Sequence, residues 1–192
     1  MATRILVLAD VHYPNTVRSA LRASLLGGYD KVVLLGDSVD DPLYLPDLIR
    51  AVSSVTDDVI LVKGDNEERM GIDALERYEL QPMGVVLLHG HRGDVLSEGF
   101  TKAVARAAAR LSRRLVLETY AYRVRVKGKL VVVGHAHAIG YSRAFRVVFA
   151  GSLGLPSPSR PFNEVGYAVV ESSRIELKDG TGRTLISLPL RP

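Results

Sequence analysis

Histidine occurs in this chain only in three short motifs, each of which follows a run of branched apolar residues. These motifs are Asp10-Val11-His12, His89-Gly90-His91 and Gly134-His135-Ala136-His137. Two further apolar runs end in Gly36-Asp37 and Gly64-Asp65. Nitrogen and oxygen donors without sulfur suit Mn²⁺, Fe²⁺, Co²⁺, Ni²⁺ or Zn²⁺ better than Ca²⁺. Five strand-like segments thus end in an imidazole or a carboxylate, which predicts a metal site along one sheet edge.

The spacing within each motif supports this prediction. Asp-x-His places two donors on the same side of a strand, and Gly-His-x-His repeats the spacing with two imidazoles. The glycine before Asp37 and before Asp65 lets the backbone approach closely at a tight strand exit. Taken alone, Asp10 could cap a helix and His12 could be a loop imidazole. Their clustering at strand ends favours metal ligation.

The first half of the chain alternates short apolar runs with helical patterns, which is typical of parallel strands joined by helices. Strands are expected at residues 4–9, 31–35, 59–62 and 85–88. Helices are expected at residues 15–26, 42–52 and 67–78. These strand ends carry most of the candidate ligands.

The later part of the chain, from Tyr122 onward, favours strands separated by turns rich in Gly, Pro and Ser. They are expected at residues 130–133, 143–150, 165–171, 174–177 and 184–188, and predict a second, largely antiparallel sheet. Two sheets packed face to face with helices outside give an α/β fold, a four-layer α/β/β/α sandwich. A length of 192 residues suits one domain spanning residues 1–192.

Basic residues concentrate at about residues 97–129. From Lys102 to Lys129 there are nine Lys or Arg and one acid, a local charge of +8 in a chain whose total is +4. A helix is expected from about Ser97 to about Leu117, with Phe100, Val104, Ala107, Ala108, Leu111 and Leu115 on an apolar face and Lys102, Arg106, Arg110, Arg113 and Arg114 opposite. The favoured interpretation of the basic face is that it is simply exposed to solvent. Nucleic-acid contact is the alternative, but no aromatic residues lie among these arginines to stack on bases.

The composition excludes several classes of chemistry. The absence of cysteine excludes disulfides, thiolate ligands and a cysteine nucleophile. The chain has no signal-peptide pattern and no apolar run near the roughly 20 residues of a membrane span, so a soluble, cytoplasmic protein is expected. Arginine supplies 19 of 25 basic residues and amide side chains are few, a bias typical of a hyperthermophile or of GC-rich coding.

The order Asp-x-His, Gly-Asp, Gly-(Asn/Asp), His, Gly-His-x-His resembles the calcineurin-like metallophosphoesterases. The motifs extend from Asp10 to His137, and a Gly151-Ser152 turn follows. The sequence looks closest to the small bacterial and archaeal phosphodiesterase branch, which includes the retromer subunit of this fold. The resemblance implies two mixed sheets between helical layers and two divalent ions, with Mn²⁺ expected and Ni²⁺, Zn²⁺, Fe²⁺ or Co²⁺ as alternatives.

The resemblance also implies which residues hold each ion. One ion would be held by Asp10, His12, Asp37 and His137. The other would be held by Asp37, Asp65, His89 and His135, so that Asp37 bridges the two.

The chain departs from the family at residues 64–67. Where the family usually has Gly-Asn-His-(Asp/Glu), this chain has Gly-Asp-Asn-Glu. Asp65 would replace a neutral ligand with an anion that repels phosphate, as in the retromer subunit, although it could instead cap the next helix. Asn66 would replace the usual proton donor. Asn66 is expected to contact phosphate, with a plain turn residue as the alternative. His91 is expected to contact phosphate or to donate a proton, with a residue that orients the loop as the alternative.

The predicted activity is hydrolysis of a phosphate ester by water activated between two ions, with Asp37, Asn66 and His91 as catalytic residues. A diester is favoured because it carries less negative charge near Asp65. The alternatives are a protein-binding scaffold and a nuclease using the basic helix, and a homo-oligomer is left open. Three acids near the motifs are interpreted as exposed loop residues: Asp40, Asp41 and Asp94.

Overall fold

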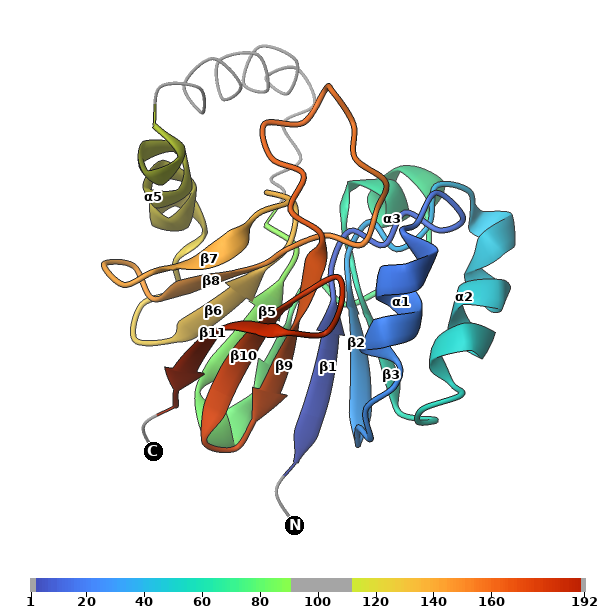
Figure 1. Cartoon of the computed structure of the whole chain (residues 1–192), viewed down its shortest axis with the longest axis horizontal. Helices are drawn as coiled ribbons and strands as arrows, with labels where there is room; N and C mark the ends of the chain where they lie inside the picture. The colour runs from blue at the N-terminus through green and yellow to red at the C-terminus, as the bar shows by residue number, and fades with distance from the viewer. Residues whose placement is uncertain (1–2, 91–111, 191–192) are drawn as a thin grey trace.

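The computed structural model describes residues 3–90 and 112–190, and its larger sheet has six strands (Figure 1). Their order is β11-β10-β9-β1-β2-β3. The strands are β1 (Arg4–Leu8), β2 (Lys31–Leu35), β3 (Val59–Val62), β9 (Gly166–Glu171), β10 (Arg174–Asp179) and β11 (Thr184–Pro189). β1, β2 and β3 pair in parallel, whereas β9 pairs antiparallel with both β1 and β10. The sheet is therefore mixed.

The smaller sheet has five strands in the order β4-β5-β6-β8-β7. They are β4 (Tyr78–Leu80), β5 (Val85–Leu88), β6 (Leu130–Val133), β7 (Ile139–Ser142) and β8 (Val147–Ala150). β5, β6 and β8 are parallel, and the two edge strands are antiparallel to their neighbours. The second sheet is also mixed.

The apolar residues of the strands alternate between two faces, and this alternation builds the layers. In β1, Ile5 and Val7 point into the core between the sheets, while Leu6 and Leu8 pack on the opposite face. Helices α1 (Arg18–Ser24) and α2 (Leu45–Val52) cover that outer face of the larger sheet. Helix α5 (Arg113–Val124) covers the outer face of the smaller sheet, so the four-layer α/β/β/α sandwich is confirmed (Figure 1).

Three short helical segments complete the described part of the chain. Helix α3 (Asp65–Met70) follows β3, and the 3₁₀ turns η1 (Pro42–Tyr44) and η2 (Gln81–Met83) precede α2 and β5. Within residues 3–90 and 112–190, no helix is long and apolar enough to cross a bilayer.

The expected second antiparallel sheet is wrong. β6 and β8 extend the parallel pairing that begins at β5, and β9 returns to pair with β1. The predicted strand at residues 143–150 begins only at Val147. The preceding residues turn the chain, with Arg146 at a φ of 55°, and residues 139–142 form a separate strand. Local periodicity does not encode which sheet a strand joins.

The helix predictions need two corrections. Ser112 is extended (φ −157°, ψ 103°) and its hydroxyl accepts a hydrogen bond from the amide of Leu115, so α5 starts at Arg113 and the expected helix is not continuous to Leu117. Leu115 is 63% exposed, while Leu117 and Ala121 are buried. The expected helix at residues 67–78 ends at Met70, because Gly71 adopts a left-handed conformation. The basic positions 102, 106 and 110 lie outside the described residues.

Candidate metal centre

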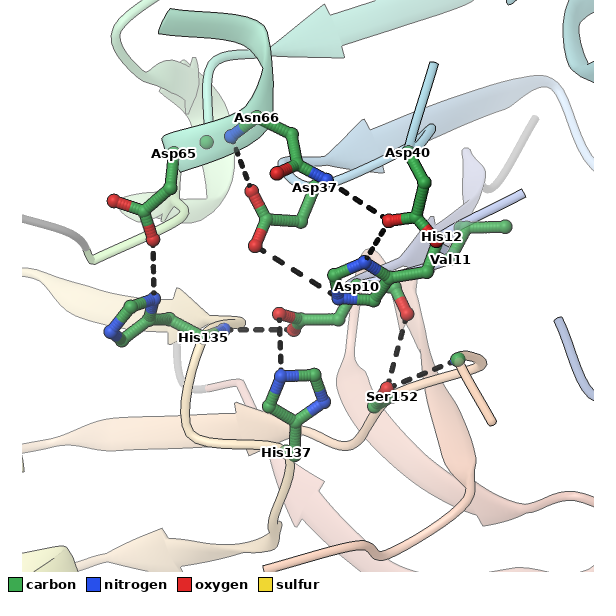
Figure 2. A network of polar contacts seen from close by, with 12 residues as sticks. Asp10, Val11, His12, Asp37, Asp40, Asp65, Asn66, His135, His137 and Ser152 are labelled. Atoms are coloured by element: carbon green, nitrogen blue, oxygen red, sulfur yellow. Dashed lines mark hydrogen bonds and ion pairs between the residues drawn. The ribbon is translucent and has the colours of Figure 1, made fainter. Parts of the chain in front are cut away.

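All seven residues predicted as metal ligands lie together where parallel strands of both sheets end. They are Asp10 and His12 after β1, Asp37 after β2, Asp65 after β3, His89 after β5, and His135 and His137 after β6. Figure 2 shows six of them converging from the two sheets. The seventh, His89, is buried beside Asp37. His91, the predicted proton donor, lies outside the described residues.

The donor atoms form three groups, of which two share no residue and the third, Asp10, Asp37 and His89, overlaps both. The first group is Asp10, His12 and His137, and the second group is Asp65, His89 and His135; within each group one donor atom per residue lies within 4.8 Å of the others. In the first, His137 Nε2 lies 3.3 Å from Asp10 Oδ1. In the second, His135 Nδ1 lies 3.0 Å from Asp65 Oδ2 and 3.3 Å from His89 Nε2.

Asp37 lies between the two groups. Its Oδ2 is 3.9 Å from His12 Nε2 in the first group and 3.7 Å from His89 Nε2 in the second. Its Oδ1 accepts a hydrogen bond of 2.9 Å from the backbone amide of Asn66, which fixes the orientation of the carboxylate. One oxygen is thus held by the backbone while the other faces imidazoles from both groups.

The backbone at these residues is strained. Five of the six non-glycine residues with positive φ in the described part of the chain are candidate ligands, namely Asp10, His12, Asp37, His135 and His137. L-residues adopt this conformation rarely, at a cost of about 1–3 kcal/mol each, and such strain clusters at functional sites. The strained residues direct their side chains to one point, which favours a site selected for function.

Two glycines allow the opposing strand ends to approach. A Cβ atom at Gly36, whose φ is +75°, would lie 2.4 Å from Cγ of His89. A Cβ atom at Gly134 would lie 2.8 Å from Oδ2 of Asp10. That oxygen accepts a hydrogen bond of 2.8 Å from the amide of His135. The absence of a side chain therefore lets the two sheets contribute to one site.

Glu67 holds the two Gly-Asp loops together. Its buried carboxylate accepts hydrogen bonds of 2.8 Å from the amides of Asp37, Ser38 and Gly64. From the sequence, Glu67 is predicted only to start a helix. Glu67 is the third residue of α3, and a glutamate at that position can accept a hydrogen bond from the backbone amide of the N-cap residue. That pattern could have indicated its bond to Gly64. The bonds to Asp37 and Ser38 are tertiary, so that pattern could not reveal them.

Asp40 is a second residue whose role the sequence did not predict. Interpreted from the sequence as an exposed loop acid, it is partly buried, and its Oδ1 lies 2.7 Å from Nδ1 of His12. Partial burial opposes ionisation, but hydrogen bonds from His12 and Asn15 hold the pKa of Asp40 below its usual range. Because the carboxylate is ionised, Nδ1 of His12 must be the donor. In a neutral imidazole, Nε2 then carries the lone pair.

The other two acids near the motifs differ from Asp40. Asp41 is partly buried, not exposed, and its carboxylate caps the η1 turn by accepting a hydrogen bond of 2.9 Å from the amide of Leu43. Asp94 lies outside the described residues.

Asn66 is buried and its amide is engaged in hydrogen bonds. Nδ2 donates to the carbonyl of Val39 at 2.8 Å and to Asp40 Oδ1 at 3.2 Å. Oδ1 accepts a hydrogen bond of 3.0 Å from Arg69. These bonds link Asn66 to the carboxylate that orients His12; its predicted contact with phosphate stays a prediction.

The electrostatics indicate a site built for cations. Burial raises the pKa of Asp10 to about 6. Burial opposes protonation of His89, but the carboxylates of Asp37 and Asp65 raise its pKa to about 10. Burial and the charge of Arg160 lower the pKa of His137 to about 2. The carboxylates of Asp10, Asp37 and Asp65 face imidazoles at short range, and a bound cation would relieve their mutual repulsion.

Unsatisfied polar atoms support the same interpretation. Asp10 Oδ1 and His12 Nε2 are buried without a hydrogen-bond partner, and so is Nδ1 of His137. Buried polar atoms are almost always paired, so orphaned donors and acceptors at one point need an explanation. Divalent cations bound by imidazole nitrogen and carboxylate oxygen supply one.

Comparison with known proteins agrees with the geometry. Residues 3–174 match the model of the calcineurin-like phosphoesterase superfamily domain. No curated protein matches significantly. Among solved structures, a Vps29 mutant from Entamoeba histolytica has a TM-score of 0.59 and 18% identity, covering 98% of this chain and 100% of that one. A predicted phosphoesterase from Streptococcus pneumoniae has a TM-score of 0.51 and 20% identity, covering 98% and 97%. At these identities the structures show the fold alone.

Proposed function

Because the chain belongs to the calcineurin-like phosphoesterase superfamily, we propose that it is a phosphodiesterase that uses two divalent cations. The observation that carries the proposal is the position of Asp37 Oδ2, between His12 of the first donor group and His89 of the second. A carboxylate in this position suits a ligand shared by two ions.

The two donor groups fit the cations that the family implies. One would be held by the first group with Asp37, and the other by the second group with Asp37. When bound, two such ions activate a water molecule and neutralise the non-bridging oxygens of a phosphate. Mn²⁺ is the proposed ion, with Ni²⁺, Zn²⁺, Fe²⁺ and Co²⁺ as alternatives suited to mixed nitrogen and oxygen donors.

The protein's own residues orient the ligands and set the charge of the site. Asp40 fixes the tautomer of His12, and Glu67 fixes the loops that carry Asp37 and Asp65. Asp65 stays ionised because the imidazoles of His135 and His89 outweigh its partial burial and hold its pKa far below its usual range. This negative charge repels a dianionic monoester more than a monoanionic diester, which supports diester hydrolysis.

Departure of the alcohol needs a proton or a leaving group of low pKa. Asn66 has no acidic proton to give, and its amide is already bonded to Val39, Asp40 and Arg69. We assign the proton transfer to His91, which the sequence places two residues beyond His89. Hydrolysis of the proposed phosphodiester substrates should depend on His91 least when the leaving group is an activated aryl alcohol, because such a group leaves without a proton.

The proposal is tested by assaying a bis-aryl phosphodiester and an aryl phosphomonoester with Mn²⁺, Ni²⁺ or Zn²⁺, and with chelator as the control. We expect metal-dependent turnover with the diester preferred. His91→Ala should reduce turnover of an alkyl diester more than that of the aryl diester. Stoichiometric metal binding without turnover of either ester would exclude the proposed activity.

A protein-binding scaffold is the second candidate, and exposed apolar side chains beside the first donor group favour it. Leu43, three residues after Asp40, is 81% exposed. Leu155 is 50% exposed and follows Gly154, whose amide donates to the carbonyl of Asp10. Copurification of a partner, lost in a Leu43→Ser and Leu155→Ser double variant, would support this function if turnover is absent.

The nuclease alternative has less support. Of the arginines proposed to hold a polyanion, Arg113 pairs with Glu164 at 2.8 Å, which reduces the charge that it offers. Arg106 and Arg110 lie outside the described residues. Salt-sensitive nucleic-acid binding that weakens when Arg106, Arg110 and Arg113 are neutralised would support it.

A further inference from the structure

One tyrosine on α5 contacts the segments that carry both histidines of the second donor group. The ring of Tyr120 stacks on that of His135, with centroids 6.0 Å apart and an angle of 15° between the planes. Its hydroxyl donates a hydrogen bond of 3.0 Å to the carbonyl of Gly90, the residue that follows His89. The side chain therefore spans the ends of β5 and β6.

The position of Tyr120 is fixed by the packing of α5. Leu117 and Ala121, its neighbours on the helix, are buried against the outer face of the smaller sheet. Phe149 of β8 lies in the same apolar cluster, and its ring centroid is 6.0 Å from that of Tyr120. A ring held on two sides has few alternative positions.

The segment after His89 is shaped to receive the tyrosine. Gly90 has a φ of +98°, and a Cβ atom there would lie 2.4 Å from the Tyr120 hydroxyl oxygen. Any side chain at position 90 would displace this hydroxyl.

We propose that Tyr120 is a positioning residue that holds the His135 imidazole and the backbone that follows His89 in place for the second of the two cations. The inference rests on the proposed function, because it assumes that this group binds a metal. Residues that orient metal ligands typically contribute about 10- to 100-fold to metal affinity. Of the two donor groups, Tyr120 contacts only the second. Its removal should therefore weaken the binding of one ion and not of the other.

The test is titration of the metal-free protein with Mn²⁺ by calorimetry, for wild type, Tyr120→Phe and Tyr120→Ala. Tyr120→Phe keeps the stacked ring and loses the bond to Gly90, so we expect the affinity for one equivalent to fall about 10-fold. Tyr120→Ala loses both contacts and should weaken the same equivalent further. The affinity for the other equivalent should change less than about 3-fold.

Tyr122→Phe and Tyr122→Ala are the matched controls, because Tyr122 lies on the same helix, is 53% exposed and packs on Phe145 away from the site. Thermal unfolding of the metal-free variants reports whether they fold. Unchanged affinity in a folded Tyr120→Ala variant, or equal weakening of both equivalents, would overturn the proposal.

A second measurement separates this inference from the proposed function. In the metal-free protein, the stacked ring should shift the imidazole proton resonances of His135 upfield, and Tyr120→Ala should move them downfield. Failure of the wild type to bind Mn²⁺ would contradict the proposed function while this spectrum still tests the stacking. Identical His135 resonances in wild type and Tyr120→Ala would overturn the positioning role.

Discussion

Asp40 and His12 are joined by a hydrogen bond of 2.7 Å between Oδ1 and Nδ1, and this bond determines which imidazole nitrogen faces the site. The remaining nitrogen, Nε2, is buried and has no hydrogen-bond partner. A carboxylate that orients a ligating imidazole typically contributes about 10- to 100-fold to metal affinity.

We therefore expect Asp40→Ala to weaken the binding of one Mn²⁺ equivalent by about 10- to 100-fold, with Asp40→Asn intermediate because its amide oxygen can still accept from His12. Titration of the metal-free protein measures the effect. Asp47→Ala, which removes an exposed carboxylate from α2, is the control. Wild-type affinity in Asp40→Ala would show that His12 needs no orienting partner.

Glu67→Ala should destabilise the fold as well as the site. The substitution leaves the buried amides of Asp37, Ser38 and Gly64 without their acceptor. Each unsatisfied buried group costs about 1–3 kcal/mol, so the free energy of unfolding should fall by at least about 3 kcal/mol. Denaturant unfolding checks this, with the exposed neighbour Glu68→Ala as the control. A loss no larger than that of the control would mean that water replaces the carboxylate.

Asp65→Asn should shift selectivity toward monoesters. Removing one negative charge relieves the repulsion of a dianion more than that of a monoanion, and a unit charge at 4 Å is worth about 1 kcal/mol even in water. The ratio of monoester to diester kcat/KM should rise about fivefold or more. Asp73→Asn, an exposed residue after α3, controls for general charge effects. A constant ratio would remove the electrostatic reason for diester preference.

The stability of the metal-free protein should depend on pH through Asp10. Burial raises its folded pKa from 3.8 to about 6, so ionisation is harder in the folded state than in the unfolded state. The contribution of Asp10 to stability is present below pH 4 and is lost as the pH rises through about 6. Between about pH 5 and pH 7.5 the loss is about 1 kcal/mol.

Asp10→Asn removes this titration, so denaturant unfolding in chelator should give the wild type a steeper fall in stability with rising pH than the variant. Comparing the two proteins subtracts the opposing titration of His137, whose lowered pKa makes stability fall with decreasing pH. Mn²⁺ should stabilise the wild type more at about pH 7.5 than at about pH 5, because ligands bind as deprotonated groups. If stability changed with pH in the same way in both proteins, the buried carboxylate of Asp10 would not be the source of the pH dependence.

The strand ends that carry the site were predictable from the sequence. The strands predicted at residues 31–35, 59–62 and 85–88 match β2, β3 and β5. Each is a short apolar run that ends in Gly-Asp or His-Gly, and such a run is too short for a helix. Parallel strands bring their carboxyl ends to one edge, which explains why Asp37 and Asp65 lie together after β2 and β3. The expected site along a single sheet edge was wrong, because His89 follows β5 of the smaller sheet and both sheets contribute ligands.

The supporting residues could not be predicted in the same way. Asp40 and Glu67 act across 28 to 30 residues of sequence, through contacts that depend on how the loops fold. Tyr120 was missed because the expected helix ended near Leu117, whereas α5 is capped by Ser112 and extends to Val124. Pairing of β9 with β1 is likewise long-range, which is why the expected antiparallel sheet was wrong.

The most direct test of the account is the rate of bis-aryl phosphodiester hydrolysis as Mn²⁺ is added to the metal-free protein, for wild type, Asp37→Asn and His89→Ala. We predict that the wild-type rate rises until two equivalents are bound. Both variants should lose turnover, because Asp37 would be shared by the two ions and His89, whose Nε2 lies 3.7 Å from Asp37 Oδ2, would hold one of them. A rate that saturates at one equivalent, or undiminished turnover in either variant, would contradict the two-metal assignment.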